Sequence, residues 1–203
     1  MNWNTLPSDE IVEATKQAIE KNGIQVIVVD TAAEAKEAAL KLIPKQSQVM
    51  TMTSATLDET GIAEAINISG DYDAAKPKLY AMDRATQGKE MQQLGASPEY
   101  AIGSMNALTQ DGKLFWASMT GSQLSAYAYG SAHTIWVVST QKIVPTMEDA
   151  LKRIYEYVLP LESERAKKAY GVPGSSVNKL LMIEREINPG RSTVILVKEK
   201  LGF

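Results

Sequence analysis

Short β-branched runs alternate with helical segments in the first part of the chain. Residues 24–29 (Ile-Gln-Val-Ile-Val-Val) are almost uninterruptedly apolar, which is typical of a strand buried on both faces. Thr31 and Glu34 then form a capping box that opens a helix, and Pro44 ends it. Residues 48–52 repeat the strand signal. This alternation predicts an α/β fold with a mostly parallel, Rossmann-like sheet and helices on both faces.

The middle of the chain is less regular, but its elements can be assigned by the same criteria. Asp111-Gly112 is a hairpin-turn pair between two β-rich runs, residues 106–109 and 113–118. The other expected elements are strands over 78–81, 100–104 and 134–138, and helices over 8–22, 56–68 (opened by a Thr56–Glu59 capping box), 86–94, 121–129 and 146–170.

The end of the chain carries two further β-rich runs, residues 179–186 and 192–197. Asn188-Pro189-Gly190-Arg191 lies between them and is a turn by composition. We therefore expect an antiparallel C-terminal strand pair at one edge of the parallel sheet.

Composition limits the possible partners and cofactors. The length of 203 residues favours a single domain over residues 1–203. The net charge is −3 without a dense Lys/Arg cluster, which argues against nucleic acid as a partner. The chain has no cysteine and a single histidine, so we expect neither a metal nor any other cofactor. A secretory signal and a membrane-length apolar run are not visible, which favours a cytoplasmic protein without a membrane partner.

Three loops that follow predicted strands are rich in hydroxyl side chains, and they are residues 51–56 (first loop), 118–123 (second loop) and 139–142 (third loop). Ligands of open α/β sheets bind outside the carboxyl ends of the strands, where hydroxyls and free backbone N–H groups can hold a carboxylate, a phosphate or a CoA-like group. For any one of these loops an ordinary helix cap is the favoured explanation, whereas three such loops at the same sheet edge shift the balance towards a binding site. The candidate ligand-binding residues are Thr53, Ser54, Thr56, Asn106, Thr120, Gly121, Ser122, Gln123 and Lys142.

No residue stands out as catalytic. His133 has no carboxylate nearby in sequence and is assigned a structural role, while Asp111 and Glu59 are explained by a turn and a capping box. Lys142 and Arg84 could each neutralise an anion, although a solvated charge is the ordinary state of such side chains. The catalytic residues therefore stay unassigned.

Several segments resemble the LUD (lactate utilisation) domain family, the LutC/YkgG group. They are residues 49–61, with Thr-Ser-Ala-Thr-Leu-Asp-Glu-Thr-Gly, residues 100–145, with Asp-Gly-Lys-Leu, Thr-Gly-Ser-Gln and Ile-Trp-Val-Val-Ser-Thr-Gln-Lys-Ile-Val-Pro, and the ending Gly-Arg-Ser-Thr-Val-Ile-Leu-Val-Lys-Glu-Lys-Leu-Gly-Phe. The resemblance implies a NagB/RpiA/CoA transferase-like fold. It also implies a role near lactate or other organic-acid oxidation, with iron–sulfur partner subunits.

Three functions remain open at this point. The leading one is an accessory protein that binds a small anion within an organic-acid pathway. The alternative is an enzyme of the same superfold, of the isomerase, CoA transferase or cyclo-ligase type, acting on a phosphorylated or carboxylate substrate. The third is a structural interaction protein without a ligand. A homo-oligomer is possible with any of the three. A lysine or carboxylate with a strongly shifted pKa inside a strand-end pocket would favour the enzyme.

Overall fold

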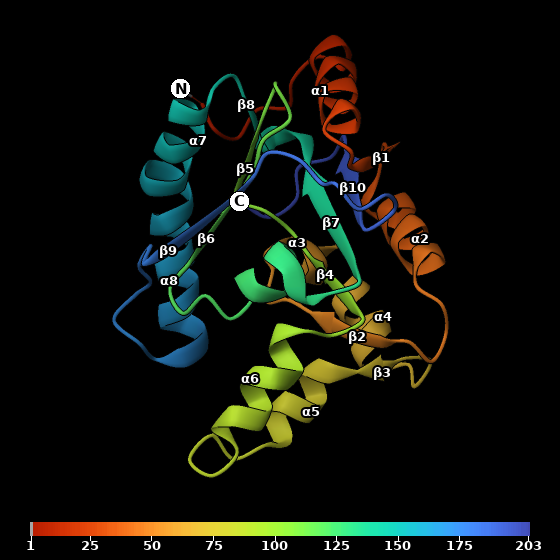
Figure 1. Ribbon diagram of the computed structural model, residues 1–203. Coiled ribbons are helices and arrows are strands. Elements are labelled where there is room, and N and C mark those ends of the chain that lie inside the picture. The colour runs from red at the N-terminus through yellow and green to blue at the C-terminus, as the bar shows by residue number, and fades with distance from the viewer. Residues whose placement is uncertain (1) are drawn as a thin grey trace.

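The computed structural model describes residues 2–203, and its centre is a six-stranded sheet in which all strands run parallel (Figure 1). The strand order is β1-β10-β7-β4-β2-β3. The strands are β1 (Gln25–Val29), β2 (Gln48–Thr51), β3 (Asp73–Ala74), β4 (Tyr100–Gly103), β7 (His133–Ser139) and β10 (Ser192–Val197). The predicted α/β fold with a mostly parallel sheet is confirmed.

A second, four-stranded sheet has the order β8-β5-β6-β9. Its strands are β5 (Ala107–Thr109), β6 (Leu114–Ser118), β8 (Ile143–Val144) and β9 (Lys179–Ile183). β5 and β6 form the predicted hairpin around Asp111-Gly112, and β9 continues the sheet antiparallel to β6. β8 pairs with β5 in the parallel direction, so this sheet is mixed.

Helices and the second sheet cover the parallel sheet on both faces. The helices are α1 (Asp9–Lys21), α2 (Ala32–Leu42), α3 (Ala55–Glu59), α4 (Ile62–Asn67), α5 (Ala75–Ala81), α6 (Gly88–Ala96), α7 (Met147–Arg153) and α8 (Leu159–Tyr170), with the π-helices η1 (Ala126–Gly130) and η3 (Ile154–Val158) and the 3₁₀ helix η2 (Thr140–Lys142). None of those in residues 2–203 has the length and apolar character needed to cross a membrane.

Three apolar cores hold these layers together. Residues of α2, α3 and α4 pack on one face of the parallel sheet. The opposite face packs against α1, η1 and the second sheet. The outer face of the second sheet packs against α7 and η3 (Figure 1). The order of layers is therefore helices, parallel sheet, second sheet with α1 and η1, and again helices.

Three aromatic side chains join the two sheets. The ring centroids of Trp116 and Trp136 lie 4.9 Å apart, and Tyr127 lies 5.3 Å from Trp116. All three side chains are fully buried. Each buries about 150–250 Å² of surface, so this cluster is a major source of the attraction between the sheets.

The C-terminal strands differ from the expectation. β9 and β10 do not pair with each other, because β9 is the edge of the second sheet and β10 lies between β1 and β7 at the centre of the parallel sheet. Every residue of β10 is buried, whereas three of the five residues of β9 are exposed. A strand that is apolar on both faces needs cover on both faces, which the centre of the parallel sheet provides.

Of the two expected capping boxes, one is present and one is absent, and one expected strand is a helix. The Thr31–Glu34 capping box is present. The expected Thr56–Glu59 box is absent, because Ser54 caps α3 and Thr56 lies within the helix. Residues 78–81 belong to helix α5 and not to a strand. This short helix packs on β2, and its Lys78 and Tyr80 side chains are exposed.

A buried ion pair closes the turn that precedes β10. Arg191 donates from Nη1 to Glu186 Oε2 at 2.7 Å, and the two side chains are only 10% and 9% exposed. Arg191 also donates to the carbonyl oxygens of Ala126, Tyr127 and Ser131. One guanidinium thus fixes both the entry to β10 and the end of η1.

Replacing Arg191 with Met should lower the free energy of unfolding by about 1–3 kcal/mol, because the Glu186 carboxylate would keep only its bonds from the Asn188 N–H and the Ser192 hydroxyl. Urea unfolding measures the change. Arg185→Met is the matched control, since Arg185 is exposed and should change stability by less than about 0.5 kcal/mol. Equal losses in both variants would contradict the assignment.

Candidate functional site

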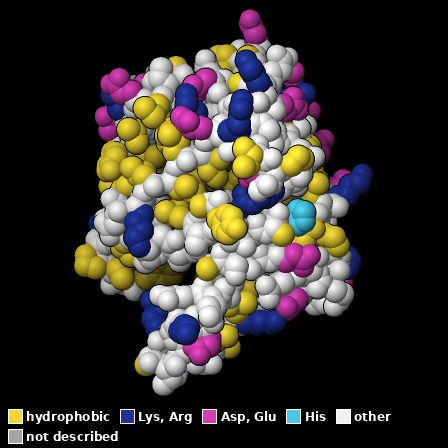
Figure 2. All heavy atoms as spheres, in the orientation of Figure 1, with side chains coloured by type: hydrophobic (Ala, Val, Ile, Leu, Met, Phe, Trp, Pro, Cys, Tyr) yellow, Lys and Arg dark blue, Asp and Glu magenta, His cyan; other side chains and the backbone are white. Residues whose placement is uncertain are grey.

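A large cavity opens at the carboxyl ends of the parallel strands. Its volume is about 1070 Å³, and its walls come from the segments after β2, β4 and β6, from η2, and from helices α5, α6 and α8. Figure 2 shows the surface hollowed in the region between α8 and α6. Its position is the one at which ligands bind to open α/β sheets.

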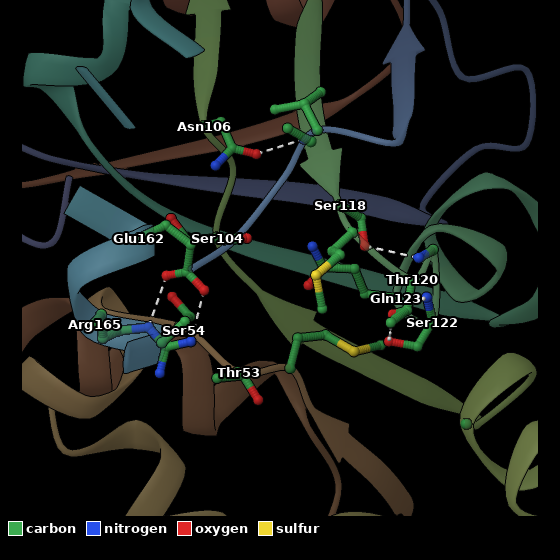
Figure 3. Close-up of a pocket in the computed structure, with 18 of the residues that line it drawn as sticks. Thr53, Ser54, Ser104, Asn106, Ser118, Thr120, Ser122, Gln123, Glu162 and Arg165 are labelled. Atoms are coloured by element: carbon green, nitrogen blue, oxygen red, sulfur yellow. Dashed lines mark hydrogen bonds and ion pairs between the residues drawn. The ribbon is translucent and has the colours of Figure 1, made fainter. Parts of the chain in front are cut away.

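All of the candidate ligand-binding residues lie around this one cavity. Figure 3 shows the first hydroxyl loop on one side and the second on the other. The lining residues from the sequence-based set are Thr53, Ser54, Thr56, Asn106, Thr120, Gly121, Ser122, Gln123 and Lys142. The structure thus brings these residues together, and ligand binding by them stays a prediction.

Of the first-loop hydroxyls at the cavity, two have hydrogen-bond partners within the protein and one has none among residues 2–203. Ser54 Oγ accepts from the backbone N–H of Leu57 at 3.4 Å and caps α3, as the ordinary interpretation of such a residue expects. Thr53 is exposed, and its hydroxyl has no hydrogen-bond partner in the described part of the chain. Thr56 is buried, and its hydroxyl accepts from Lys142. Thr53 is therefore the hydroxyl of this loop that is free to contact a ligand.

The second loop does not cap a helix. Thr120 Oγ1 and Ser122 Oγ lie 3.2 Å apart, and Ser118 Oγ accepts from the Gly121 N–H at 2.8 Å. The helical turn leading into η1 begins two residues after Ser122. Gly121 has a φ of 84°, a conformation that other residues rarely adopt. The hydroxyls of this loop are thus held by one another, at the wall of the cavity (Figure 3).

Asn106 and most of the third loop make hydrogen bonds within the protein. Asn106 Oδ1 accepts from the Ala117 N–H at 2.7 Å and bridges the β5–β6 hairpin. Ser139 and Gln141 bind backbone carbonyls of residues 199–202 and do not line the cavity. From the third loop, only Lys142 reaches it.

Lys142 is buried at the floor of the cavity with an exposure of 2%. Its Nζ donates to Met105 O at 3.1 Å, to Ser104 Oγ at 3.2 Å and to Thr56 Oγ1 at 3.3 Å. The expectation of a solvated charge is therefore wrong for this lysine. Three polar atoms replace its water shell, and no carboxylate oxygen is among them.

The environment of Lys142 favours the neutral amine. Burial first, and then the nearby positive charge of Arg153, lower its pKa from 10.5 to about 7, while Glu59 acts in the opposite direction. A lysine with a pKa near 7 is divided between its two protonation states at neutral pH. It can therefore accept a proton or donate one under the same conditions.

Arg153 lies beneath this site and was not identified from the sequence. It is fully buried, its Nη1 donates to Asn106 O, and its guanidinium lies 5.2 Å from the ring centroid of Tyr157. Its Nε and Nη2 have no partner among residues 2–203, and burial lowers its pKa to about 10. An arginine at the end of a helix gives no sequence signal that distinguishes it from a surface cation.

The cavity wall contains other charged residues that sequence reasoning missed or left as surface residues. Glu162 and Arg165 of α8 form a two-bonded pair at 2.7 Å (Figure 3). Lys76 of α5 and Arg84 of the α5–α6 loop also line the cavity. The spacing Glu162–Arg165 matches a common surface pair of a helix, so no local pattern could have placed it here.

The remaining candidates have structural explanations. His133 stacks on Tyr100 with ring centroids 4.6 Å apart, and Asp111 binds Thr109 and Lys113 within its turn. Glu59 does not close a capping box but accepts from the Gly202 N–H at 2.7 Å. Within residues 2–203, no three His, Cys, Asp or Glu side chains group as a metal site would require.

The burial of Lys142 should appear in the pH dependence of stability. Because its pKa is lower in the folded chain than in the unfolded chain, the free energy of unfolding rises as the pH increases from about 7 towards 10.5. In Lys142→Met this rise should be smaller, by on the order of 2 kcal/mol between pH 7 and pH 9. Urea unfolding across this range measures it, with Lys89→Met as the exposed control. Identical slopes in wild type and Lys142→Met would show that Lys142 is charged when buried.

Replacing Gly121 with Val should strain the backbone by about 1–3 kcal/mol. A Cβ at this position would also lie 2.6 Å from Lys179 Cδ, so the Lys179 side chain would have to move. Gly70→Val is the control, because Gly70 has a φ of 77° but no neighbour within 4 Å. Thermal unfolding should show similar losses in both, whereas ligand affinity should fall only in Gly121→Val.

Comparison with known proteins supports the fold and identifies the family. A DUF162 family protein from Deinococcus radiodurans has a similar structure, with a TM-score of 0.58 and 16% identity over 95% of this chain and 99% of that one. No curated protein matches the chain. The model of the LUD domain matches residues 12–197. The chain therefore belongs to the LUD domain family.

Proposed function

We propose that this protein is an enzyme that acts on an organic acid or phosphorylated compound with a carbonyl group. The observation that carries the proposal is Lys142, a buried amine at the floor of a strand-end cavity, with a pKa of about 7. A proton-transfer group works best when its pKa is close to the working pH. Such shifts are concentrated at functional sites.

The proposed reaction is proton transfer at the carbon next to the carbonyl group, as in an isomerase. The C–H bond breaks, its electron pair forms an enolate, and neutral Lys142 takes the proton on Nζ and later returns it. Burial and the positive charge of Arg153 favour the neutral amine, which has two N–H groups and one lone pair. It can donate to only two of its three neighbours Met105, Ser104 and Thr56, so one of these contacts must be given up before the lone pair can take the substrate proton. Hydroxyls of the two loops are donors for the enolate oxygen.

Charge supports an anionic substrate. Lys76, Arg84 and Arg165 line the cavity, and Glu162 is the one acidic residue of the described chain that lines it. The chain as a whole has a net charge of −3, so its cavity is opposite in sign to the rest of the molecule. Membership in the LUD domain family supports a carboxylate of the lactate-utilisation type as one such substrate.

A second candidate is an accessory protein that holds the anion without transforming it, beside iron–sulfur partner subunits. One observation favours it. Glu162 is paired with Arg165, so Lys142 lacks a carboxylate partner within the cavity that could handle a second proton. The two candidates share the binding site and differ in whether a substrate proton is exchanged.

Proton exchange with D₂O separates the candidates. A panel of oxo acids and sugar phosphates, incubated with the protein in D₂O, should include compounds whose α-proton is replaced by deuterium, as measured by ¹H NMR. The exchange rate should rise with pH around 7 as Lys142 loses its proton, and Lys142→Met should lower it at least 100-fold.

Lys89→Met is the control and should exchange at the wild-type rate. Compounds that bind by calorimetry but exchange no proton would favour the accessory role. Exchange that persists in Lys142→Met would show that another group is the base.

A further inference from the structure

The cavity is larger than a simple organic acid requires. Its volume of about 1070 Å³ is slightly above the range of about 300–1,000 Å³ that is usual for pockets of drug-sized ligands. An acid of the size of lactate would fill a small part of it, so the volume indicates a longer ligand.

Cationic side chains extend from the floor of the cavity to its mouth. Lys142 is buried at the floor, Lys76 and Arg165 are half-buried, and Arg84 is exposed. Lys76 and Arg84 have no hydrogen-bond acceptor and no ion-pair partner in the described part of the chain. By contrast, Lys78, on the same helix as Lys76, is paired with Asp73.

Glu162 accepts hydrogen bonds from only two of the three guanidinium nitrogens of Arg165. Its Nε and Nη2 donate to the two Glu162 oxygens, and its guanidinium carbon lies 5.5 Å from the ring centroid of Tyr170, whose hydroxyl also interacts with it. The pair leaves the Arg165 side chain 29% exposed at the cavity wall (Figure 3). A bidentate guanidinium of this kind keeps one edge for a phosphate or carboxylate.

Lys76 and Lys142 have different electrostatic neighbours. Burial lowers the pKa of Lys76, and the charges that act on it are those of Asp58 and Arg165. The charges that act on Lys142 are those of Arg153 and Glu59. The two lysines thus respond to different neighbouring charges.

The lining of the cavity also suits an apolar segment of a ligand. Met50, Met52, Met91 and Leu79 line the cavity along with Met105 and Met119. Methionine side chains are flexible and polarisable, so they adapt to apolar groups of different shape. A hydrocarbon chain between two polar ends matches this lining.

We propose that the mouth of the cavity holds a second anion subsite, formed by Lys76, Arg84 and Arg165, for a phosphate or carboxylate at the far end of an elongated substrate. This inference deepens the proposed function and rests on it, since the reacting end of the substrate lies at Lys142. The substrate class is an acyl or oxo compound with an apolar middle segment and a terminal anion.

Linear dicarboxylates of increasing length test the second subsite, with monocarboxylates of equal length as the reference. Calorimetric titration should show a dicarboxylate length at which binding is at least 10-fold tighter than that of the matching monocarboxylate. In the double variant Lys76→Ala/Arg84→Ala this advantage should disappear, while monocarboxylate affinity should stay within 2-fold. Lys78→Ala is the control and should keep the full advantage.

Two outcomes would overturn the subsite: equal affinity of mono- and dicarboxylates at every length, or the same loss for both in the double variant. Pyrophosphate as a competitor distinguishes the two anions, since displacement of the dicarboxylate at low concentration identifies a phosphate subsite and failure to displace it identifies a carboxylate subsite. Lys142→Met should keep the length dependence while losing proton exchange. The subsite and the proposed reaction can therefore fail independently.

Discussion

The parallel arrangement of the central sheet is the constraint on which the site depends. Because its six strands point the same way, all of their carboxyl ends lie along one edge, and the segments that leave β2, β4 and β7 must turn there. The second sheet and α8 cover this edge at a distance and leave the cavity between them. The hydroxyl loops lie on its walls, and Lys142, which follows β7, lies at its floor.

Three consecutive residues between β4 and β5 connect this edge to the second sheet. Ser104 accepts from Trp116 Nε1 and from Lys142, Met105 accepts from Lys142, and Asn106 binds Arg153 and Ala117. The position of the amine is therefore fixed by the same backbone that joins the sheets. A buried ammonium opposes folding, so this rigid setting is maintained at a cost in stability, as is common for functional sites.

Local sequence signals were sufficient for much of the fold, and non-local contacts decided the rest. The Thr31–Glu34 capping box and the Asp111-Gly112 hairpin involve residues close in sequence, and both are present. The pairing of β10 with β1 and β7 involves residues that are far apart, and the turn before β10 gave no information about it. The hydroxyl loops could be found because strand ends can be read from the sequence. Arg153, Lys76 and the burial of Lys142 could not, because they depend on how α5, α7 and the second sheet pack.

The place of β10 in the sheet has a consequence for how the chain folds. β1 contacts the rest of the parallel sheet only through β10, which is the last strand in the sequence. β1 can therefore pair with a neighbouring strand only after almost the whole chain has been synthesised. Pairings over such sequence distances form slowly. During synthesis, β1 and β7 would present open edges to other chains until the final strand inserts between them, and this interval is the one in which the protein is most prone to aggregate.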